Sequence, residues 1–491
     1  MTGQFGMVGE RYDARGVPVR SETVRVPLEF QLASVVLGGL GRLVFAIAQR
    51  PWLWGGAVVG WLLWLTIGTV GLAACVATTG ALLVAWWHLR RVSFDHFVRF
   101  RARAAMRRVW VYRRQWQPAM VTAGLDVRIG QRQYLPELRR VRSTGSVDRV
   151  TVRMLSGQIL DDYAEMAERL ALSLDAVECR VRTVPPTRRH RREIELWFLV
   201  FDPLEEVVPV IDAPAVADFA SLPVARREDG GLFGLRLLGS HVLVVGATGS
   251  GKGSVLWSLV NVLAPAVRCQ LVELWVCDPK GGMEFAAGAP MFHRYSYGDG
   301  AAAEPNAYEG GFADFLEDAV AVMRQRQRRL RGITRLHEPT CGDPLVVVLV
   351  DELASLTAYV TDREARNRIK AALSLLLSQG RAVGVVVVAA LQDPRKEVLP
   401  FRDLFPTRIA LRLTEPEQVD MTLGEGARRR GAACDRISEA LPGVGYVVID
   451  GIAEPVRVRF AYVSDDHITA IAVPDDLTEL AASAADRGQP S

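Results

Sequence analysis

Lysine is scarce in this chain, and its scarcity limits what the charge balance can show. The chain has 59 lysines and arginines, and only four are lysines: Lys252, Lys280, Lys370 and Lys396. Such a bias is typical of high-GC coding, so the abundance of arginine does not by itself indicate a nucleic-acid partner. A lysine that is present in this background is a candidate for a specific task.

Cysteine pairs at metal-binding spacing are missing as well. The six cysteines are scattered, and no two of them form a C-x-x-C pair. The pattern indicates neither a zinc ribbon nor a disulfide framework, so we expect the soluble part in a reducing cytosol. The hydrophobic share of 49% and the mean hydropathy of +0.14 exclude disorder as the main state and indicate a membrane segment.

The longest uncharged stretch runs over 39 residues, from Pro51 to Leu89. As one helix it would measure about 58 Å, roughly twice the ~30 Å hydrocarbon core of a bilayer. We therefore predict two transmembrane helices, about 52–70 and 71–89, with a turn in the glycine-containing stretch 66–71. Both flanks are basic, so the positive-inside rule predicts a multi-pass protein of the cell membrane with both termini in the cytoplasm.

Two alternatives concern this membrane region. The hairpin could instead be buried in a large soluble core, although the stretch lacks the polar stripe that such helices carry. The preceding apolar residues, 32–49, are either an interfacial helix or a further span, and their periodicity does not decide between the two.

A basic, aromatic-rich stretch follows the membrane region. Residues 90–142 contain 14 arginines against three acidic residues. We interpret residues 92–143 as a juxtamembrane collar that contacts anionic lipid head groups, with direct DNA contact as the alternative. Alternating patterns then predict strands at 149–155, 178–184 and 192–202 and a helix at 161–174, hence a small α/β module at 144–205. Residues 206–235 have the composition of a linker.

The sequence HVLVVGATGSGKGSVLWSLV, which starts at His241, has the order strand, glycine-rich loop, helix. In this arrangement backbone N–H groups and the helix N-terminus surround the phosphates of ATP, and Lys252 reaches the β- and γ-phosphates. The predicted nucleotide-binding residues are Gly246, Ala247, Thr248, Gly249, Ser250, Gly251, Lys252, Gly253 and Ser254.

One position departs from the usual phosphate loop. Gly253 stands where a Ser or Thr normally offers a hydroxyl to Mg²⁺, and Ser254 follows one residue later. One residue turns a helix by about 100°, so Ser254 is not an automatic substitute. Three explanations are open: the loop readjusts, water fills the ligand position, or the site is catalytically weak.

An acidic pair completes the predicted ATP site. The apolar strand Leu345–Val350 ends in Asp351 and Glu352. At the carboxyl end of a buried parallel strand, Asp351 is expected at Mg²⁺ and Glu352 where it can polarise the attacking water. Gln392 follows another apolar strand, 384–391, where a side chain that senses the γ-phosphate would lie. The combination predicts hydrolysis of ATP.

Five segments resemble, in this order, the FtsK/SpoIIIE family of DNA-pumping ATPases: GATGSGKGS, CDPKGGMEF, VLVDELASL, SQGRAVGVVVVAALQDPR and FPTRIALRL. The chain is most similar to the short, membrane-anchored members found with actinobacterial conjugative and integrative elements. The resemblance implies an α/β fold with a RecA-like P-loop motor and a mainly parallel sheet. It also implies a homo-hexameric ring that threads double-stranded DNA.

The resemblance also assigns residues and a division of the chain. It carries over the segment Asp278, Pro279 and Lys280, and it makes Arg381 and Arg408 candidates for the arginine that reaches a neighbouring subunit's ATP. The candidate catalytic residues are thus Glu352, Lys252, Gln392, Arg381 and Arg408, with Asp351 as metal ligand and ATP and Mg²⁺ as cofactors. The expected division is 1–31 N-terminal segment, 32–91 membrane region, 92–143 collar, 144–205 module, 206–235 linker, 236–465 motor and 466–491 tail.

We therefore expect a membrane-anchored, ATP-driven translocase of double-stranded DNA in conjugative transfer or DNA segregation. Its partners would be DNA, the cytoplasmic membrane and other membrane proteins of a transfer apparatus. The second hypothesis is an ATPase coupled to protein secretion, as in type VII systems, which usually string several ATPase modules together, whereas this chain has one phosphate loop. The third is a non-hydrolysing nucleotide-binding scaffold, motivated by Gly253.

Overall fold

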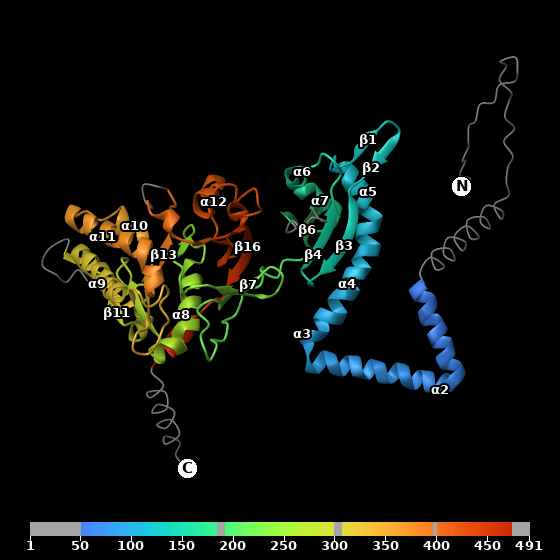
Figure 1. Cartoon of the computed structure of the whole chain (residues 1–491), viewed down its shortest axis with the longest axis horizontal. Helices are drawn as coiled ribbons and strands as arrows, with labels where there is room; N and C mark the ends of the chain where they lie inside the picture. The colour runs from blue at the N-terminus through green and yellow to red at the C-terminus, as the bar shows by residue number, and fades with distance from the viewer. Residues whose placement is uncertain (1–50, 184–191, 299–306, 396–399, 474–491) are drawn as a thin grey trace, which may run out of the picture. The chain divides into compact units, whose positions relative to one another are not determined.

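The computed structural model describes residues 51–183, 192–298, 307–395 and 400–473 (Figure 1). It divides into two compact units, Met1–Asp95 and His96–Ser491. The predicted N-terminal segment 1–31, the apolar stretch 32–49 and residues 474–491 of the predicted tail lie outside the described residues.

The described part of the first unit is dominated by one long apolar helix with a break. α2 (Pro51–Leu89) is interrupted at Gly68, whose φ of 69° and ψ of −179° favour glycine, and Figure 1 shows the bend. The break falls in the stretch 66–71, where the turn was predicted. Among the described residues, one helix, Gly68–Leu89, is long and apolar enough to cross a membrane, with a mean hydropathy of 1.8. The structure thus gives one candidate span where the sequence predicted two.

The second unit begins with a four-stranded antiparallel sheet in the order β3-β4-β6-β5. Its core lies between this sheet and the helices α4, α5, α6 and α7. The helices are α4 (Phe100–Arg107), α5 (Arg113–Thr122), α6 (Leu160–Glu165) and α7 (Ala167–Ser173), whereas α3 (Arg91–Phe94) belongs to the first unit. The strands are β3 (Glu137–Ser143), β4 (Val147–Arg153), β5 (Glu178–Thr183) and β6 (Glu193–Leu199), beside the hairpin β1 (Val127–Ile129) and β2 (Arg132–Tyr134).

The prediction of a separate basic collar at 92–143 is wrong over most of that range. α4, α5 and the residues between them pack on the sheet through side chains that include Tyr112, Trp116 and Met120, and β3 is one of its strands. Arg107 is itself buried and donates to Asp148 Oδ2 over 2.5 Å. The apolar residues at helical spacing therefore decide where this stretch lies, and the module starts near residue 96.

The motor is built on a ten-stranded sheet in the order β11-β10-β12-β13-β9-β14-β15-β16-β7-β8. The six strands from β11 to β14 are parallel, and the pairings from β14 to β8 are antiparallel. The parallel strands are β9 (Val242–Val245), β10 (Val272–Cys277), β11 (Arg294–Ser296), β12 (Leu345–Val350), β13 (Val385–Leu391) and β14 (Thr407–Ala410). The others are β7 (Leu222–Arg227), β8 (Leu232–Leu235), β15 (Val444–Ile449) and β16 (Ile452–Phe460).

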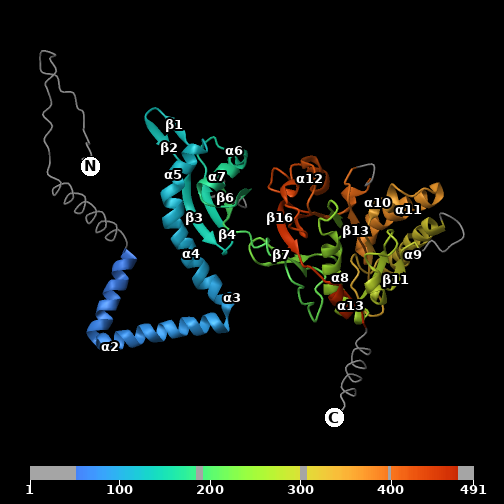
Figure 2. The same cartoon turned by 180° about the vertical axis from the view of Figure 1, so that it is seen from behind.

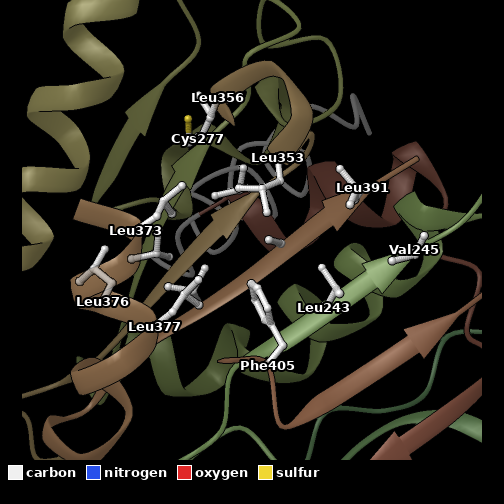
Figure 3. Close-up of a cluster of buried hydrophobic side chains, with 14 of the residues drawn as sticks. Leu243, Val245, Cys277, Leu353, Leu356, Leu373, Leu376, Leu377, Leu391 and Phe405 are labelled. Carbon is white, nitrogen blue, oxygen red and sulfur yellow. The ribbon is translucent and has the colours of Figure 1, made fainter. Parts of the chain in front are cut away.

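Helices cover both faces of this sheet, which is the layering of a RecA-like P-loop motor. One face packs against α9 (Ala307–Leu330), α10 (Leu353–Thr357), α11 (Arg363–Leu375) and α12 (Pro416–Leu423), and the other against α8 (Lys252–Arg268) and α13 (Asp465–Ala472). Figures 1 and 2 show α9 and α11 side by side. In Figure 3, Leu243 of β9 and Leu391 of β13 point into the same buried cluster as Leu373 and Leu377.

Two predicted boundaries of the motor need correction. The linker expected at 206–235 contains β7, which pairs with β16, and β8, which pairs with β7, so both extend the large sheet. The turn REDGG between them is a hairpin signal that a purely compositional reading takes for a linker. The tail expected at 466–491 includes most of α13, whose Ile468 is buried against the sheet's α8 face.

Candidate active site

The glycine-rich loop connects the buried strand β9 to the first turn of α8 in the middle of the sheet. Gly249 and Gly251 have φ of 72° and 92°, in the left-handed region that favours glycine. At Gly251 a Cβ would also lie 2.3 Å from the backbone nitrogen of Gly443, and at Gly246 a Cβ would lie 2.3 Å from Ser250 Oγ. Close packing therefore fixes the path of this loop.

Lys252 is the first residue of α8 and folds over the loop. Its Nζ donates to the carbonyl oxygens of Gly246, over 2.9 Å, and Ala247, over 3.3 Å. Burial lowers the pKa of Lys252, and the negative charge of Glu352 opposes that shift. The ammonium group thus lies at the loop and within the field of the acidic pair.

Gln392 lies beside the loop at the end of β13. Thr248 Oγ1 donates to Gln392 Oε1 over 3.0 Å. β13 is inserted between β9, which leads into the loop, and β12, which ends at Asp351 and Glu352. Sheet order therefore places Gln392 between the phosphate loop and the acidic pair.

The acidic pair is buried and forms an ion pair with the side chain of Lys280. Asp351 and Glu352 are each 4% exposed. Lys280 Nζ lies 2.7 Å from Asp351 Oδ2 and 3.7 Å from Glu352 Oε2. Burial acts to lower the pKa of Lys280, but the hydrogen bond and charge of Asp351 raise it more, so the net pKa is above its ordinary value. Lys280 remains charged at neutral pH in this position.

Asp278, at the carboxyl end of β10, organises the turn that presents Lys280. It is fully buried, and its Oδ1 accepts from Lys280 N over 3.2 Å while Oδ2 accepts from Glu284 N over 3.0 Å. Gly281 and Gly282 turn the chain with φ of 77° and 79°. The segment Asp278–Lys280 is thus held together by backbone hydrogen bonds to one carboxylate.

Glu284, which was not among the predicted site residues, lies against Gly253. A Cβ on Gly253 would meet Glu284 Oε1 at 2.5 Å, closer than any side chain allows. Burial, followed by the charges of Asp351 and Asp278, raises the pKa of Glu284 above its ordinary value. The side chain of Ser254 has a different neighbour. A Cβ at Gly443 would lie 3.7 Å from Ser254 Cβ and 3.8 Å from Ser254 Oγ.

Arg381 and Arg408 do not reach the phosphate loop of their own chain. Both stand where β13 and β14 begin, and the loop follows the carboxyl end of the parallel strand β9. They line an open cleft of about 640 Å³ together with Asp403. Arg408 Nε donates to Phe405 O over 3.0 Å, and burial lowers its pKa. The cleft is thus on the sheet edge opposite the nucleotide-binding loop.

The structure brings together most of what the sequence singled out. The phosphate loop, the acidic pair, Lys280 and Gln392 meet at the carboxyl edge of the parallel strands, with two lysines among three carboxylates. Glu284 is the residue that sequence reasoning missed. The sequence gives no local signal for it, because Glu284 and Gly253 lie in separate segments that the fold brings together.

The chain matches the model of the FtsK/SpoIIIE family over residues 203–440. Transfer protein TraSA of Streptomyces ambofaciens is 29% identical over 344 residues, which cover 66% of this chain and 78% of that protein. DNA translocase FtsK 2 of Ralstonia nicotianae is 26% identical over 284 residues, 52% of this chain and 32% of the relative. The chain thus spans most of the transfer protein and about a third of the translocase.

Solved structures with a similar course of the chain include the conjugation coupling protein TcpA of pCW3, in a monomer form with ATPγS. Its TM-score is 0.44 at 18% identity, and the match covers 75% of this chain and 98% of TcpA. The cytoplasmic domain of the type VII secretion ATPase EccC of Thermomonospora curvata has a TM-score of 0.42 at 22% identity, over 54% of this chain and 34% of EccC.

Proposed function

Because its motor domain belongs to the FtsK/SpoIIIE family, we propose that this chain is an ATPase that moves double-stranded DNA in conjugative transfer or DNA segregation. The observation that carries the proposal is a phosphate loop that faces the buried pair Asp351 and Glu352 in a motor of this family. The names of the relatives, a transfer protein and DNA translocases, support DNA as the substrate.

In this proposal the residues at the carboxyl edge of the parallel strands have separate roles in ATP hydrolysis. Residues 246–254 bind the nucleotide, and Lys252 exchanges its contacts with the loop carbonyls for the β- and γ-phosphates. Glu352 orients and polarises the attacking water, and Gln392 senses the γ-phosphate from its place beside Thr248. The hydrogen bond between Gln392 and Thr248 supports this role because it couples the loop to the end of β13.

Mg²⁺ is the expected companion of ATP, and we assign Asp351 to hold it. Among the described residues no group of three or more His, Cys, Asp or Glu is arranged to hold a metal ion. Proteins usually bind Mg²⁺ through one or two carboxylates plus phosphates and water, and the buried Asp351 supplies one such carboxylate. The cradle beside Gly253, which a carboxylate fills, supports the fit. When bound, the ion neutralises charge that develops on the phosphate oxygens.

The proposal includes a hexameric ring in which Arg381 or Arg408 acts on the neighbouring subunit's ATP. Both arginines lie at the sheet edge opposite the phosphate loop of their own chain, so only a second copy could bring one of them to that site. An arginine supplied in trans stabilises the charge of the transferred phosphoryl group. Their position in an open cleft supports accessibility to such a neighbour.

A membrane anchor is also part of the proposal. The apolar helix Gly68–Leu89 supports one span, and the first arm of α2 together with the break at Gly68 supports a second. With basic residues on both flanks, the motor would lie in the cytoplasm, where other membrane proteins of a transfer apparatus could bind the anchor.

The test is ATP turnover by the full chain in detergent, measured with and without linear duplex DNA. We expect DNA to raise turnover and the stimulation to fall steeply with salt, because phosphate contacts release counterions. Glu352→Gln is the matched control, since it should abolish turnover at all DNA concentrations. Stimulation by a secreted peptide and none by DNA would favour the secretion ATPase, and no turnover under any condition would favour the scaffold.

A further inference from the structure

The space beside the first turn of α8 is shared by two residues that are far apart in sequence. Gly253 has no side chain, and Glu284 Oε1 lies 2.5 Å from where its Cβ would be. A serine or threonine at position 253, as in the usual phosphate loop, could not coexist with Glu284 in this position. The absence of a hydroxyl at position 253 and the presence of the Glu284 carboxylate beside it are therefore linked, because the carboxylate occupies the space that a side chain at 253 would take.

Glu284 is held in this place by its backbone. Its N–H and that of Phe285 both donate to Asp278 Oδ2, over 3.0 and 3.3 Å. Phe285 is fully buried and its ring packs on Trp257 of α8, with ring centroids 5.1 Å apart. The turn after β10 is thus anchored on the same helix that carries Gly253, so the backbone of Glu284 is held within reach of that position.

Ser254 does not offer a comparable replacement. Its side chain lies beside Gly443, on the part of α8 that contacts the segment before β15. Glu284 instead lies near Gly253, and the charges of Asp351 and Lys280 act on it. Of the two oxygen-bearing side chains near the missing hydroxyl, Glu284 is the one that lies at Gly253 and on which the charge of Asp351 acts.

We propose that Glu284 supplies the oxygen for Mg²⁺ that a hydroxyl supplies in the usual phosphate loop, and that Gly253 provides the space it needs. The proposal rests on the proposed ATPase function and specifies its metal site. A carboxylate is a ligand that Mg²⁺ accepts, and Asp351 with Glu284 makes the two carboxylates that such sites commonly have. The charge of Lys280 offsets part of the repulsion between them.

The experiment measures how tightly Mn²⁺ binds to the full chain in detergent with ATPγS. Mn²⁺ serves as a paramagnetic substitute for Mg²⁺. We expect Glu284→Gln to weaken Mn²⁺ binding by about tenfold or more, the range seen when a group supporting a metal is lost. ATPγS binding in EDTA should remain within about threefold, a difference of roughly 0.7 kcal/mol. Glu338→Gln, the same chemical change at an exposed residue, should leave both affinities unchanged.

A compensating pair makes the test independent of a general loss of structure. Glu284→Ala and Gly253→Ser should each weaken Mn²⁺ binding, the second because its side chain displaces the carboxylate. The double variant has both the hydroxyl and the space, and we expect it to bind Mn²⁺ more tightly than either single variant. Thermal unfolding of every variant checks the fold.

Two results would overturn the inference. One is Mn²⁺ binding by Glu284→Gln that equals the wild type, and the other is a double variant that binds Mn²⁺ no more tightly than the better of its two single variants. Neither readout requires turnover or DNA, so a failure of the metal assignment can be told apart from a failure of the translocase proposal. A wild type that binds Mn²⁺ with ATPγS but shows no DNA-stimulated turnover would contradict only the latter.

Discussion

Glu352 is the residue at which binding and hydrolysis of ATP should separate. It is buried beside Asp351 and takes part in the field around Lys252, yet no phosphate contact is assigned to it. We expect Glu352→Gln to reduce ATP turnover by about a hundredfold or more, the usual contribution of a positioned general base. Equilibrium binding of a fluorescent ATP analogue should be unchanged, and turnover within about tenfold of wild type would exclude this role.

Lys252 should behave differently, because its ammonium group is assigned to the phosphates themselves. A hydrogen bond to a charged group contributes about 1.5–3 kcal/mol, so we expect Lys252→Ala to weaken ATP binding by roughly tenfold to a hundredfold. The same analogue titration measures it. Lys370→Ala on α11 is the matched control, and equal effects of the two substitutions would contradict the assignment.

His241, at the start of β9, predicts a pH dependence of stability. Burial, reinforced by the charge of Arg381, lowers the pKa of His241 to about 4, and its Nδ1 accepts from Val387 N over 3.0 Å. Because the folded-state pKa lies below the unfolded value of about 6.5, the unfolded chain binds the extra proton as pH falls from about 6.5 towards 4. The folded state therefore loses roughly 2 kcal/mol by pH 5.

Thermal unfolding at pH 7 and pH 5 measures this effect. We expect the unfolding temperature of the wild type to fall more between these pH values than that of His241→Asn, whose amide oxygen can accept the Val387 hydrogen bond without titrating. An equal fall in both proteins would show that other groups cause the acid sensitivity.

Helices and strands whose apolar residues repeat with one clear period were predictable from the sequence. The strand before the phosphate loop, the helix after it and the continuous apolar strand before Asp351 have patterns that only one structure satisfies. The hairpin β7–β8 was missed because its strands are short and lie at the edge of the sheet, where polar residues such as Arg227 are tolerated.

The assignment of α4 and α5 to a basic collar is wrong because it rests on their charge and not on the helical spacing of their apolar residues. Exposed arginines dominate the composition of this stretch, whereas Tyr112, directly before α5, and Met120 of α5 are both fully buried and determine which face packs. The contact between Glu284 and Gly253 could not be derived from local patterns, because it joins the turn after β10 to the first turn of α8, which follows β9, and sheet order brings these segments together. Contacts in the site between residues that are far apart in sequence could be identified only from the three-dimensional structure.

A buried ion pair joins the four-stranded module to the segment after β7. Arg180 Nη1 lies 2.6 Å from Glu228 Oε2, with side chains 6% and 7% exposed, and Arg180 also donates to Glu178. Burial acts to lower the pKa of Arg180, but the charge of Glu228 and its other partners raise it well above its ordinary value. Glu228→Gln leaves the buried guanidinium with less compensation, so we expect a loss of about 3 kcal/mol in stability.

Chemical unfolding of the wild type, Glu228→Gln and Glu205→Gln measures that loss. Glu205 is an exposed glutamate in the same unit, so its amide variant should unfold at the wild-type denaturant concentration. If Glu228→Gln does the same, the ion pair contributes nothing net to stability.

For the whole molecule, the proposed hairpin makes a prediction about topology. Reporter domains fused before Leu32 and after Arg91 should both report the cytoplasm, because two spans return the chain to the side on which it started. A fusion at Gly68, where α2 breaks, should report the opposite side. Opposite signals from the two flanks would indicate a single span, the one helix that the structure gives as a candidate.

The central claim is that ATP hydrolysis by this chain moves it along duplex DNA. The most direct measurement is displacement of a third strand from a triplex on linear duplex DNA by the full chain in detergent. We predict displacement that requires ATP and Mg²⁺, fails in Glu352→Gln, and slows as the distance from the free DNA end to the triplex increases. DNA-stimulated ATP turnover without any displacement of the third strand would contradict the account.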